Sequence, residues 1–407
     1  MSELDRRSFL KTSVLGTSAA LAAPSLLARF QSAAPSPAHA PEEKNTRPVV
    51  RRTLGKTGIS LPVVSMGVMR ADSPALVRAA LKAGIVFFDT AHGYQKGRNE
   101  EMLGEVFTGV QRSSYIIATK VPPEDMDRQT NTIGPGSTKE AFLKHLDESL
   151  RRLKLDFVDI LYVHGISARE HVLHPEMIAA VTEAKKSGKT KFVGVSTHQN
   201  METVIDAAVE SHVYDVVLTA INFQYHTPDS FRKTTARAAA AGIGIVAMKT
   251  MAGGFFDKEK QKPVNCKAAL KWVLQDPNIT TCIPGMTTFD QLQENISVNE
   301  DIKLTDEEKT SLTMRESGGG MYCDGCNHCS SSCAKHLAVP DVMRAYMYAY
   351  AYGAARQAKE VLSELHFPVN PCSNCLICTA ECIKGFPIRQ RVSDMSRLAG
   401  VPDEFLV

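Results

Sequence analysis

The sequence predicts a parallel (β/α)8 TIM barrel that is followed by a small α-helical domain. From about Ser60 to about residue 300, short apolar segments rich in β-branched residues alternate about eight times with longer amphipathic segments. Eight such units in about 240 residues are typical of this barrel. The alternative is a doubly wound open sheet, which needs a glycine-rich phosphate loop after its first strand. The first strand-like segment, LPVVSMG at 61–67, is followed by VMRADS instead.

The remaining strands and the helices can be placed in order along the chain. Short apolar segments predict seven further strands, at 85–90, 115–120, 157–164, 190–196, 215–222, 243–249 and 280–285. Amphipathic segments between them predict helices, the clearest at 73–84, 138–153, 174–188 and 231–242. We therefore expect the barrel to occupy residues 53–312.

Residues 1–40 are expected to lie outside this fold. DRRSFLK at 5–11 is a twin-arginine pattern, and the apolar run after it (12–28) is too short and too rich in Ala for a membrane anchor. The alternative is a chance arginine pair before a mildly apolar helix. We predict a twin-arginine signal and linker, export by the twin-arginine machinery and a periplasmic location. Ala38-His39-Ala40 resembles a cleavage site, but Pro41 follows it, so an uncleaved tail is the alternative.

Composition excludes some classes of function. Of the 407 residues, 43% are hydrophobic and 22% are charged, as in soluble globular proteins. The formal net charge is only +3, so neither nucleic acid nor an anionic membrane surface is an expected partner.

Polar side chains follow most of the predicted strands, at the point where each strand ends. In a parallel barrel these positions meet at one end, where the active site of such barrels is found. The residues are Asp89, Lys120, His164, Ser196, Asn222 and Lys249. Their common position predicts an active site at this end of the barrel.

Three of these segments resemble the motifs of the aldo/keto reductase superfamily. They are FFDTAHGYQKGRNEEMLG at 87–104, IIATK at 116–120 and YVHG at 162–165, and the resemblance extends from residue 53 to about 300. It implies reduction of a carbonyl, or oxidation of an alcohol, with NAD(H) or NADP(H). It also implies a catalytic tetrad of Asp89, Tyr94, Lys120 and His164.

The chemistry of carbonyl reduction requires these residue types. Hydride transfer to a carbonyl carbon leaves negative charge on the oxygen, so a proton donor must lie within hydrogen-bond reach. Tyr94 would be this donor, and the ammonium of Lys120 would lower the pKa of its phenol. Asp89 would hold Lys120 by an ion pair. His164 would donate a hydrogen bond to the same carbonyl.

The resemblance implies cofactor contacts at a second group of residues. Ser196 matches a residue that binds the nicotinamide carboxamide, Asn222 stands where glutamine is usual, and Met248 replaces a stacking tyrosine. Lys249 would reach the pyrophosphate. The adenine contacts would be Glu294 and Asn295, in QENI.

The segment after the last strand predicts the choice of nicotinamide. NADPH-using members of the superfamily commonly bind the 2′-phosphate with a Lys-Ser pair and a later Arg. Gly285, Met286 and Gln291 occupy those positions here, so no cation remains there. We therefore expect NAD(H) to be favoured over NADP(H).

Eight of the ten cysteines form two copies of C-x2-C-x2-C-x3-C, which predicts two [4Fe–4S] clusters. The first copy is Cys323, Cys326, Cys329 and Cys333, and the second is Cys372, Cys375, Cys378 and Cys382. Zinc would need only two CxxC pairs per site, and disulfides are the other alternative. In two-cluster ferredoxins the fourth cysteine of each run binds the other cluster. This pattern pairs Cys382 with the first three cysteines and Cys333 with the second three.

A long helical segment lies between the two cysteine runs. Pro340 and Asp341 predict a helix start, Gly353 predicts a break, and the Tyr and Met residues between them are expected to be core. Residues 318–395 thus resemble a helical ferredoxin-like domain that is appended to some aldo/keto reductases. Cys266 and Cys282 lie outside the pattern and are expected to be ordinary buried thiols.

Two functions from different classes remain open at this point. The first is an exported oxidoreductase whose clusters either exchange electrons with a redox partner protein or are structural. The second is a non-enzymatic electron-transfer or binding protein that retains a reductase barrel. An intact tetrad favours the first. Substrate specificity is expected to come from the βα loops and from residues 317–322, beside the first cysteine run.

Overall fold

The computed structural model describes residues 48–313 and 320–406, so the twin-arginine segment lies outside the described residues.

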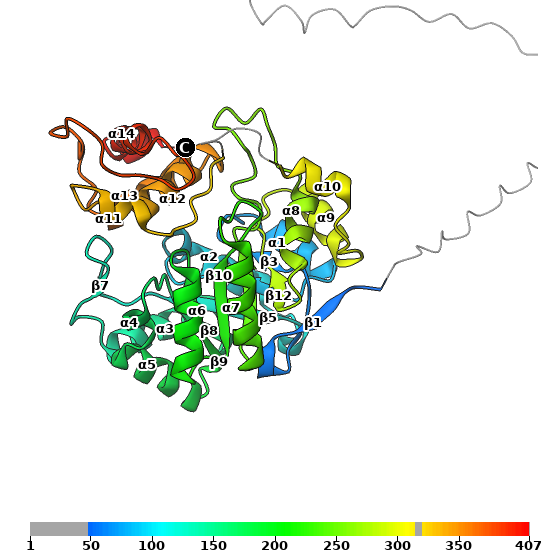
Figure 1. Ribbon diagram of the computed structural model, residues 1–407. Coiled ribbons are helices and arrows are strands. Elements are labelled where there is room, and N and C mark those ends of the chain that lie inside the picture. The colour runs from blue at the N-terminus through cyan, green and yellow to red at the C-terminus, as the bar shows by residue number, and fades with distance from the viewer. Residues whose placement is uncertain (1–47, 314–319, 407) are drawn as a thin grey trace, which may run out of the picture. The chain divides into compact units, whose positions relative to one another are not determined.

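Eight parallel strands form the sheet at the centre of the molecule. The strands are β3 (Met66–Gly67), β4 (Phe87–Asp89), β5 (Ile116–Val121), β8 (Val158–Val163), β9 (Thr190–Thr197), β10 (Val216–Ala220), β11 (Gly244–Met248) and β12 (Ile279–Cys282). Each strand pairs with its neighbours in chain order, and single parallel bridges link Val64 to Cys282 and Gly67 to Gly285. The sheet is therefore a nearly closed barrel, which confirms the predicted fold class (Figure 1).

Helices surround the barrel and cover its outer face (Figure 1). They are α1 (Pro74–Lys82), α2 (Arg98–Phe107), α3 (Lys139–Leu153), α4 (Arg169–Val172), α5 (Pro175–Lys186), α6 (Met201–Ser211), α7 (Pro228–Ala240), α8 (Cys266–Leu274), α9 (Phe289–Ile296) and α10 (Asp306–Ser311). Side chains of Ser73, Thr138 and Asn265 accept hydrogen bonds from backbone amides in the first turns of α1, α3 and α8. Such N-caps satisfy amides that have no partner within the helix.

A short antiparallel hairpin packs against the start of β11. It therefore lies at the N-terminal end of the barrel strands, away from the predicted active site. Its strands are β1 (Arg51–Thr53) and β2 (Ser60–Pro62). The backbone amide of Lys56 donates to the carbonyl of Gly242, just before β11. A second hairpin, β6 (Met126–Asp127) and β7 (Thr132–Ile133), lies in the loop after β5.

The region that carries the eight cysteines is helical, as predicted. Its helices are α11 (His328–Ser332), α12 (Val339–Tyr350), α13 (Ala355–Glu364) and α14 (Ile388–Ala399). Pro340 lies in the first turn of α12, and Gly353 has a φ of 64° in the break before α13. Met343, Met347 and Tyr348 are buried, so their assignment to a core is confirmed. In the described part of the chain, no helix is both long enough and apolar enough to cross a membrane.

The helical region is docked on the loops that follow the barrel strands, and residues 47–407 form one compact unit. After β11, a Cβ atom at Gly253 would lie 3.2 Å from the Cβ of Ala351, at the end of α12. After β10, the ring nitrogen Nδ1 of His226 lies 2.7 Å from Oδ2 of Asp324, in the first cysteine run. Helix α12 therefore lies beside the barrel end where the sequence predicts the active site. The proposed domain limits, 53–312 and 318–395, remain predictions.

Candidate active site

Asp89 and Lys120 form a buried ion pair at the ends of β4 and β5. The ammonium nitrogen of Lys120 lies 2.5 Å from Oδ1 of Asp89 and 2.5 Å from the carbonyl oxygen of Thr90. The same nitrogen lies 3.3 Å from the hydroxyl oxygen of Tyr94. The adjacent strands thus hold the lysine in a fixed position against the phenol.

His164 completes the predicted tetrad. It follows β8, and its ring lies 6.0 Å from the ring of Tyr94, centre to centre, with the planes at 82°. The structure therefore brings together all four residues that the sequence predicts to be catalytic. The second carboxylate oxygen of Asp89 is buried and has no hydrogen-bond partner among the described residues.

Burial decides the net pKa shift of the tyrosine. Burial raises the pKa of Tyr94, and the positive charges of Lys120 and Lys249 offset only part of this effect. The contribution of Lys120 has the expected sign, but burial outweighs it, so the net shift of the Tyr94 pKa is upward. Burial acts to lower the pKa of Lys120, but Asp89 and Tyr94 outweigh it, so the pKa of Lys120 is raised.

His164 is held in its neutral form. Burial lowers its pKa well below the ordinary value, and the nearby cations Lys120, Arg128, Arg344 and Lys249 lower it further. A neutral imidazole has one N–H donor and one acceptor nitrogen. It can therefore donate a hydrogen bond to a carbonyl oxygen without transferring a proton.

A cavity of about 440 Å³ begins at the tetrad, and its wall includes Asp89 and Tyr94. Four of the six predicted cofactor residues also line it: Met248, Lys249, Glu294 and Asn295. A volume of several hundred Å³ is typical of sites for small ligands and cofactors. Asn295 is 2% exposed and its Oδ1 has no partner among the described residues, as expected of a group that a ligand would satisfy.

Ser196 and Asn222 do not line this cavity. The hydroxyl of Ser196 accepts a hydrogen bond from the backbone amide of Gly165. The amide of Asn222 donates to the carbonyl of Lys249 and accepts from the backbone amide of Gln224. Both side chains are fully buried, and their cofactor roles remain predictions.

Two of the three residues that predict the choice of nicotinamide line the same cavity. Gly285 and Gln291 line it, whereas Met286 is fully buried. The cations on the wall are Lys249 and Arg70, among the described residues. Arg70 follows β3, and its guanidinium donates to the carbonyl of Tyr352. No sequence motif marks Arg70, and it was not predicted to be part of the site.

A second cavity is lined by Cys323, Cys326 and Cys329 of the first run together with Cys382 of the second. This is the group that crossed ligation predicts for one cluster. Cys372 lies close enough to Cys375, Cys378 and Cys333 for their charges to raise its pKa, in addition to the larger effect of burial. All ten cysteines are free thiols in the structure.

Each grouping contains four cysteines, the number that one [4Fe–4S] cluster requires. Within residues 48–313 and 320–406, no three Cys, His, Asp or Glu side chains are placed to share one metal ion. A [4Fe–4S] cube is held by four cysteines, each on a different iron, so its thiolates stand apart. Cys282 is fully buried, as expected, but Cys266 is half-buried and lines the large cavity, so its assignment as buried was wrong.

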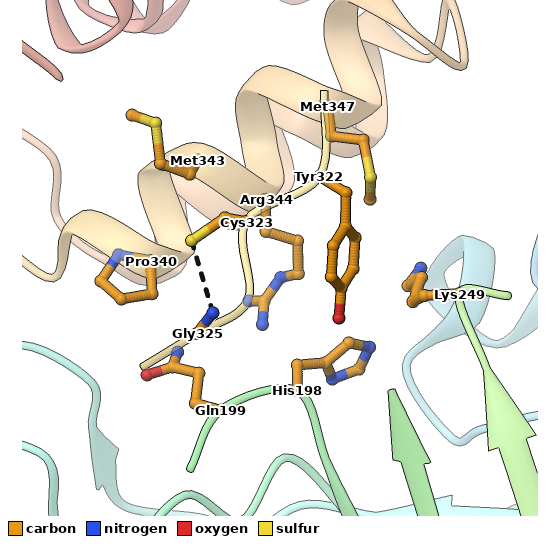
Figure 2. Close-up of a pocket in the computed structure, with 10 residues that line it drawn as sticks. All are labelled: His198, Gln199, Lys249, Tyr322, Cys323, Gly325, Pro340, Met343, Arg344 and Met347. Atoms are coloured by element: carbon orange, nitrogen blue, oxygen red, sulfur yellow. Dashed lines mark hydrogen bonds between the residues drawn. The ribbon is translucent and has the colours of Figure 1, made fainter. Parts of the chain in front are cut away.

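The cysteine-rich domain brings residues to the site that no sequence pattern indicated. Helix α12 contributes Tyr348, whose hydroxyl oxygen lies 3.0 Å from the ammonium of Lys249, and Arg344. Arg344 lines a small cavity together with Tyr322 and with His198, which follows β9 (Figure 2). Tyr322 belongs to the segment that was expected to influence specificity. No local pattern distinguishes the others from core or surface residues.

Comparison with known proteins agrees with this geometry. The aldo/keto reductase family matches residues 64–268, and a 4Fe-4S dicluster domain matches residues 322–387. The chain belongs to the aldo/keto reductase family. It is an oxidoreductase of this family that carries a 4Fe-4S dicluster domain at its C-terminal side.

Similar proteins include enzymes from plants and bacteria. L-Galactose dehydrogenase from Arabidopsis thaliana is 27% identical over 311 residues, which cover 65% of this chain and 92% of that protein. L-Glyceraldehyde 3-phosphate reductase from Escherichia coli O157:H7 is 24% identical over 327 residues, covering 66% and 92%. The structure of the aldo-keto reductase AKR11C1 from Bacillus halodurans has a TM-score of 0.53 and 22% identity, covering 65% and 95%. That likeness supports the barrel fold.

Proposed function

We propose that the protein reduces a carbonyl compound, or oxidises the corresponding alcohol, with a nicotinamide cofactor in the 440 Å³ cavity. The observation that carries the proposal is the contact of Lys120 with both Asp89 and Tyr94 at the wall of that cavity. Glu294 and Asn295 line another part of the wall, where they would contact adenine, and Oδ1 of Asn295 has no hydrogen-bond partner among the described residues.

A bound reduced nicotinamide would supply the hydride. Tyr94 donates its proton to the oxygen on which negative charge develops, and the ammonium of Lys120 stabilises the resulting phenolate. Asp89 keeps Lys120 charged and in place. Neutral His164 donates a hydrogen bond to the same oxygen and orients the carbonyl.

The eight cysteines would hold two [4Fe–4S] clusters. A cluster transfers one electron and a hydride carries two, so the clusters either exchange electrons with a partner protein or are structural. The twin-arginine pattern supports export to the periplasm, since this route carries folded proteins and a cluster must be assembled in the cytoplasm. NAD(H) is the favoured nicotinamide, because Gly285 and Gln291 offer no charge to a 2′-phosphate.

Anaerobically purified protein tests the proposal directly. A panel of aldehydes is assayed with NADH and with NADPH, and oxidation of the cofactor is followed at 340 nm, with Tyr94→Phe as the control variant. Activity that depends on Tyr94 supports the proposal. If neither cofactor binds and no aldehyde is reduced, the alternative of a non-enzymatic electron-transfer protein on a reductase barrel replaces it.

A further inference from the structure

The small cavity in Figure 2 is lined by hydrogen-bond donors from both domains. Its cations are Arg344 and Lys249, and no carboxylate is among the residues that line it. The ion pair with Asp341, at 2.7 Å, is the one polar contact of the Arg344 guanidinium within the described residues. Because a guanidinium has five N–H donors, most of its donors remain available to a ligand.

Tyr322 adds an unpaired donor to this cavity. Its side chain is 3% exposed, and its hydroxyl has no hydrogen-bond partner among the described residues. Buried hydroxyls nearly always have a partner, so an orphan on a cavity wall marks a place for a ligand atom. Figure 2 shows this hydroxyl pointing toward His198, with the guanidinium of Arg344 nearby.

The small cavity adjoins the catalytic one, since His198 and Lys249 line both. Arg344 and Lys249 also lie close enough to His164 for their charges to act on it. A molecule whose carbonyl meets Tyr94 and His164 can therefore extend a second group toward Arg344.

We propose that the small cavity binds a carboxylate of the substrate, so that the protein acts on aldehydes, ketones or alcohols that also carry a carboxylate. Arg344 and Tyr322 would be the specificity-determining residues. The volume is about 20 Å³, room for little more than one water-sized group, so an anion as large as a phosphate does not fit. Guanidinium and carboxylate match in geometry, and their hydrogen bonds are charge-assisted. This inference rests on the proposed carbonyl reduction.

A competing explanation is that the cations serve the cluster. Cys323 also lines this cavity, and a cluster bound there would carry negative charge. The two explanations differ in what they predict for neutral substrates. A carboxylate site discriminates between an acid and its amide, whereas a cation that only balances the cluster does not.

The test uses two matched pairs of aldehydes with the cluster-loaded protein. The pairs are 4-formylbenzoate with 4-formylbenzamide, and 4-oxobutanoate with 4-oxobutanamide. We expect kcat/KM to be at least about tenfold higher for the acid than for the amide in one or both pairs. Arg344→Gln should remove this preference through a loss of about 10- to 100-fold on the acid, with the amide changed by less than about threefold.

Two further variants complete the design. Tyr322→Phe keeps the ring and removes the unpaired hydroxyl, so it should lower kcat/KM for the acid several-fold and leave the amide unchanged. Arg356→Gln is the matched control, because Arg356 lies in the same domain but donates to the carbonyl of Leu406. Iron content and the electron paramagnetic resonance spectrum of each variant show whether the clusters are intact.

The outcomes separate the two proposals. Reduction of both acid and amide at equal rates overturns the carboxylate site and leaves carbonyl reduction standing. Equal losses on acid and amide in Arg344→Gln, with an altered cluster spectrum, also overturn it, in favour of a role toward the cluster. If no aldehyde is reduced, the proposed reaction fails, and calorimetry with 4-formylbenzoate then decides the site. Binding that Arg344→Gln abolishes supports it, and absence of binding overturns it.

Discussion

The ammonium nitrogen of Lys249 lies 3.0 Å from the hydroxyl oxygen of Tyr348, which joins the end of barrel strand β11 to helix α12 of the cysteine-rich domain. Lys249 has a φ of 58°, in the left-handed region that a side chain rarely adopts. Its pKa is raised to about 12, because nearby tyrosines outweigh the opposing effect of burial. The hydrogen bond is therefore charge-assisted at neutral pH.

Tyr348→Phe should destabilise the junction of the two domains. It removes this bond and leaves the lysine with one partner fewer, at a cost of about 1.5–3 kcal/mol. We expect the apparent Tm, measured anaerobically at one scan rate, to fall by several degrees. Tyr346→Phe is the matched control, since the hydroxyl of Tyr346 makes no hydrogen bond within the described residues. Equal Tm values for the two variants would show that the bond contributes nothing.

Tyr94→Phe should lower turnover by about 10²- to 10⁴-fold, the usual contribution of a positioned general acid. Cofactor affinity should hardly change, because the ring and its packing against His164 remain. Steady-state kinetics and a cofactor titration measure the two quantities separately. Unchanged turnover on every active carbonyl would exclude Tyr94 from the mechanism.

The activity should show no ionisation of His164 near pH 6.5, the ordinary pKa of a histidine. Burial lowers its pKa well below this value, so the ring stays neutral there and gains a proton only at lower pH. The pH profile of kcat/KM for the wild type should therefore have the same shape as that of His164→Gln, at a higher level. An inflection near pH 6.5 that the variant lacks would contradict this assignment.

Anaerobically purified protein should contain about eight iron and eight acid-labile sulfide ions per chain, as two four-iron clusters require. Cys382→Ala should retain about four iron ions, because it removes one ligand of the cluster held by Cys323, Cys326 and Cys329. The shared cavity of these four cysteines supports this assignment.

Double variants decide whether the ligation is crossed. With crossed ligation, adding Cys323→Ala to Cys382→Ala causes no further loss, since both residues bind the same cluster. Adding Cys372→Ala to Cys382→Ala removes the second cluster and nearly all iron. The opposite pattern of iron content would establish that each run binds its own cluster.

The fold and the tetrad could be predicted because each depends on local signals. Alternation of strands and helices specifies the barrel, and Asp89, Lys120 and His164 are at strand ends whose meeting point follows from parallel topology. The contribution of α12 could not be predicted in this way. Tyr348 sits in a helix as an ordinary core tyrosine, and its contact with Lys249 depends on how two domains pack, which no periodicity encodes.

The choice of nicotinamide depends on the cations that bind the 2′-phosphate of NADP(H). The sequence motif of this chain lacks these cations. We expect NAD(H) to bind more tightly than NADP(H). A charge-assisted hydrogen bond to phosphate contributes roughly 1.5–3 kcal/mol, so the loss of one or two such bonds lowers the affinity for NADP(H) by about tenfold to several-hundredfold. Arg70, one of two cations that line the cavity among the described residues, could compensate, but it is held at the carbonyl of Tyr352, in the loop after α12. Fluorescence titration with NADH and NADPH under anaerobic conditions measures both affinities.

A gain-of-function variant makes this prediction sharper. Gly285 lines the cavity, and a Cβ atom there would meet only the carbonyl oxygen of Gly67, at 4.0 Å, so a longer side chain fits. Gly285→Lys should therefore raise NADPH affinity about tenfold and leave NADH affinity nearly unchanged. Gly285→Gln is the control for side-chain length without charge. Binding of NADPH at least tenfold more tightly than NADH by the wild type would refute the preference, and would direct attention to Arg70 and Lys249 as the phosphate ligands.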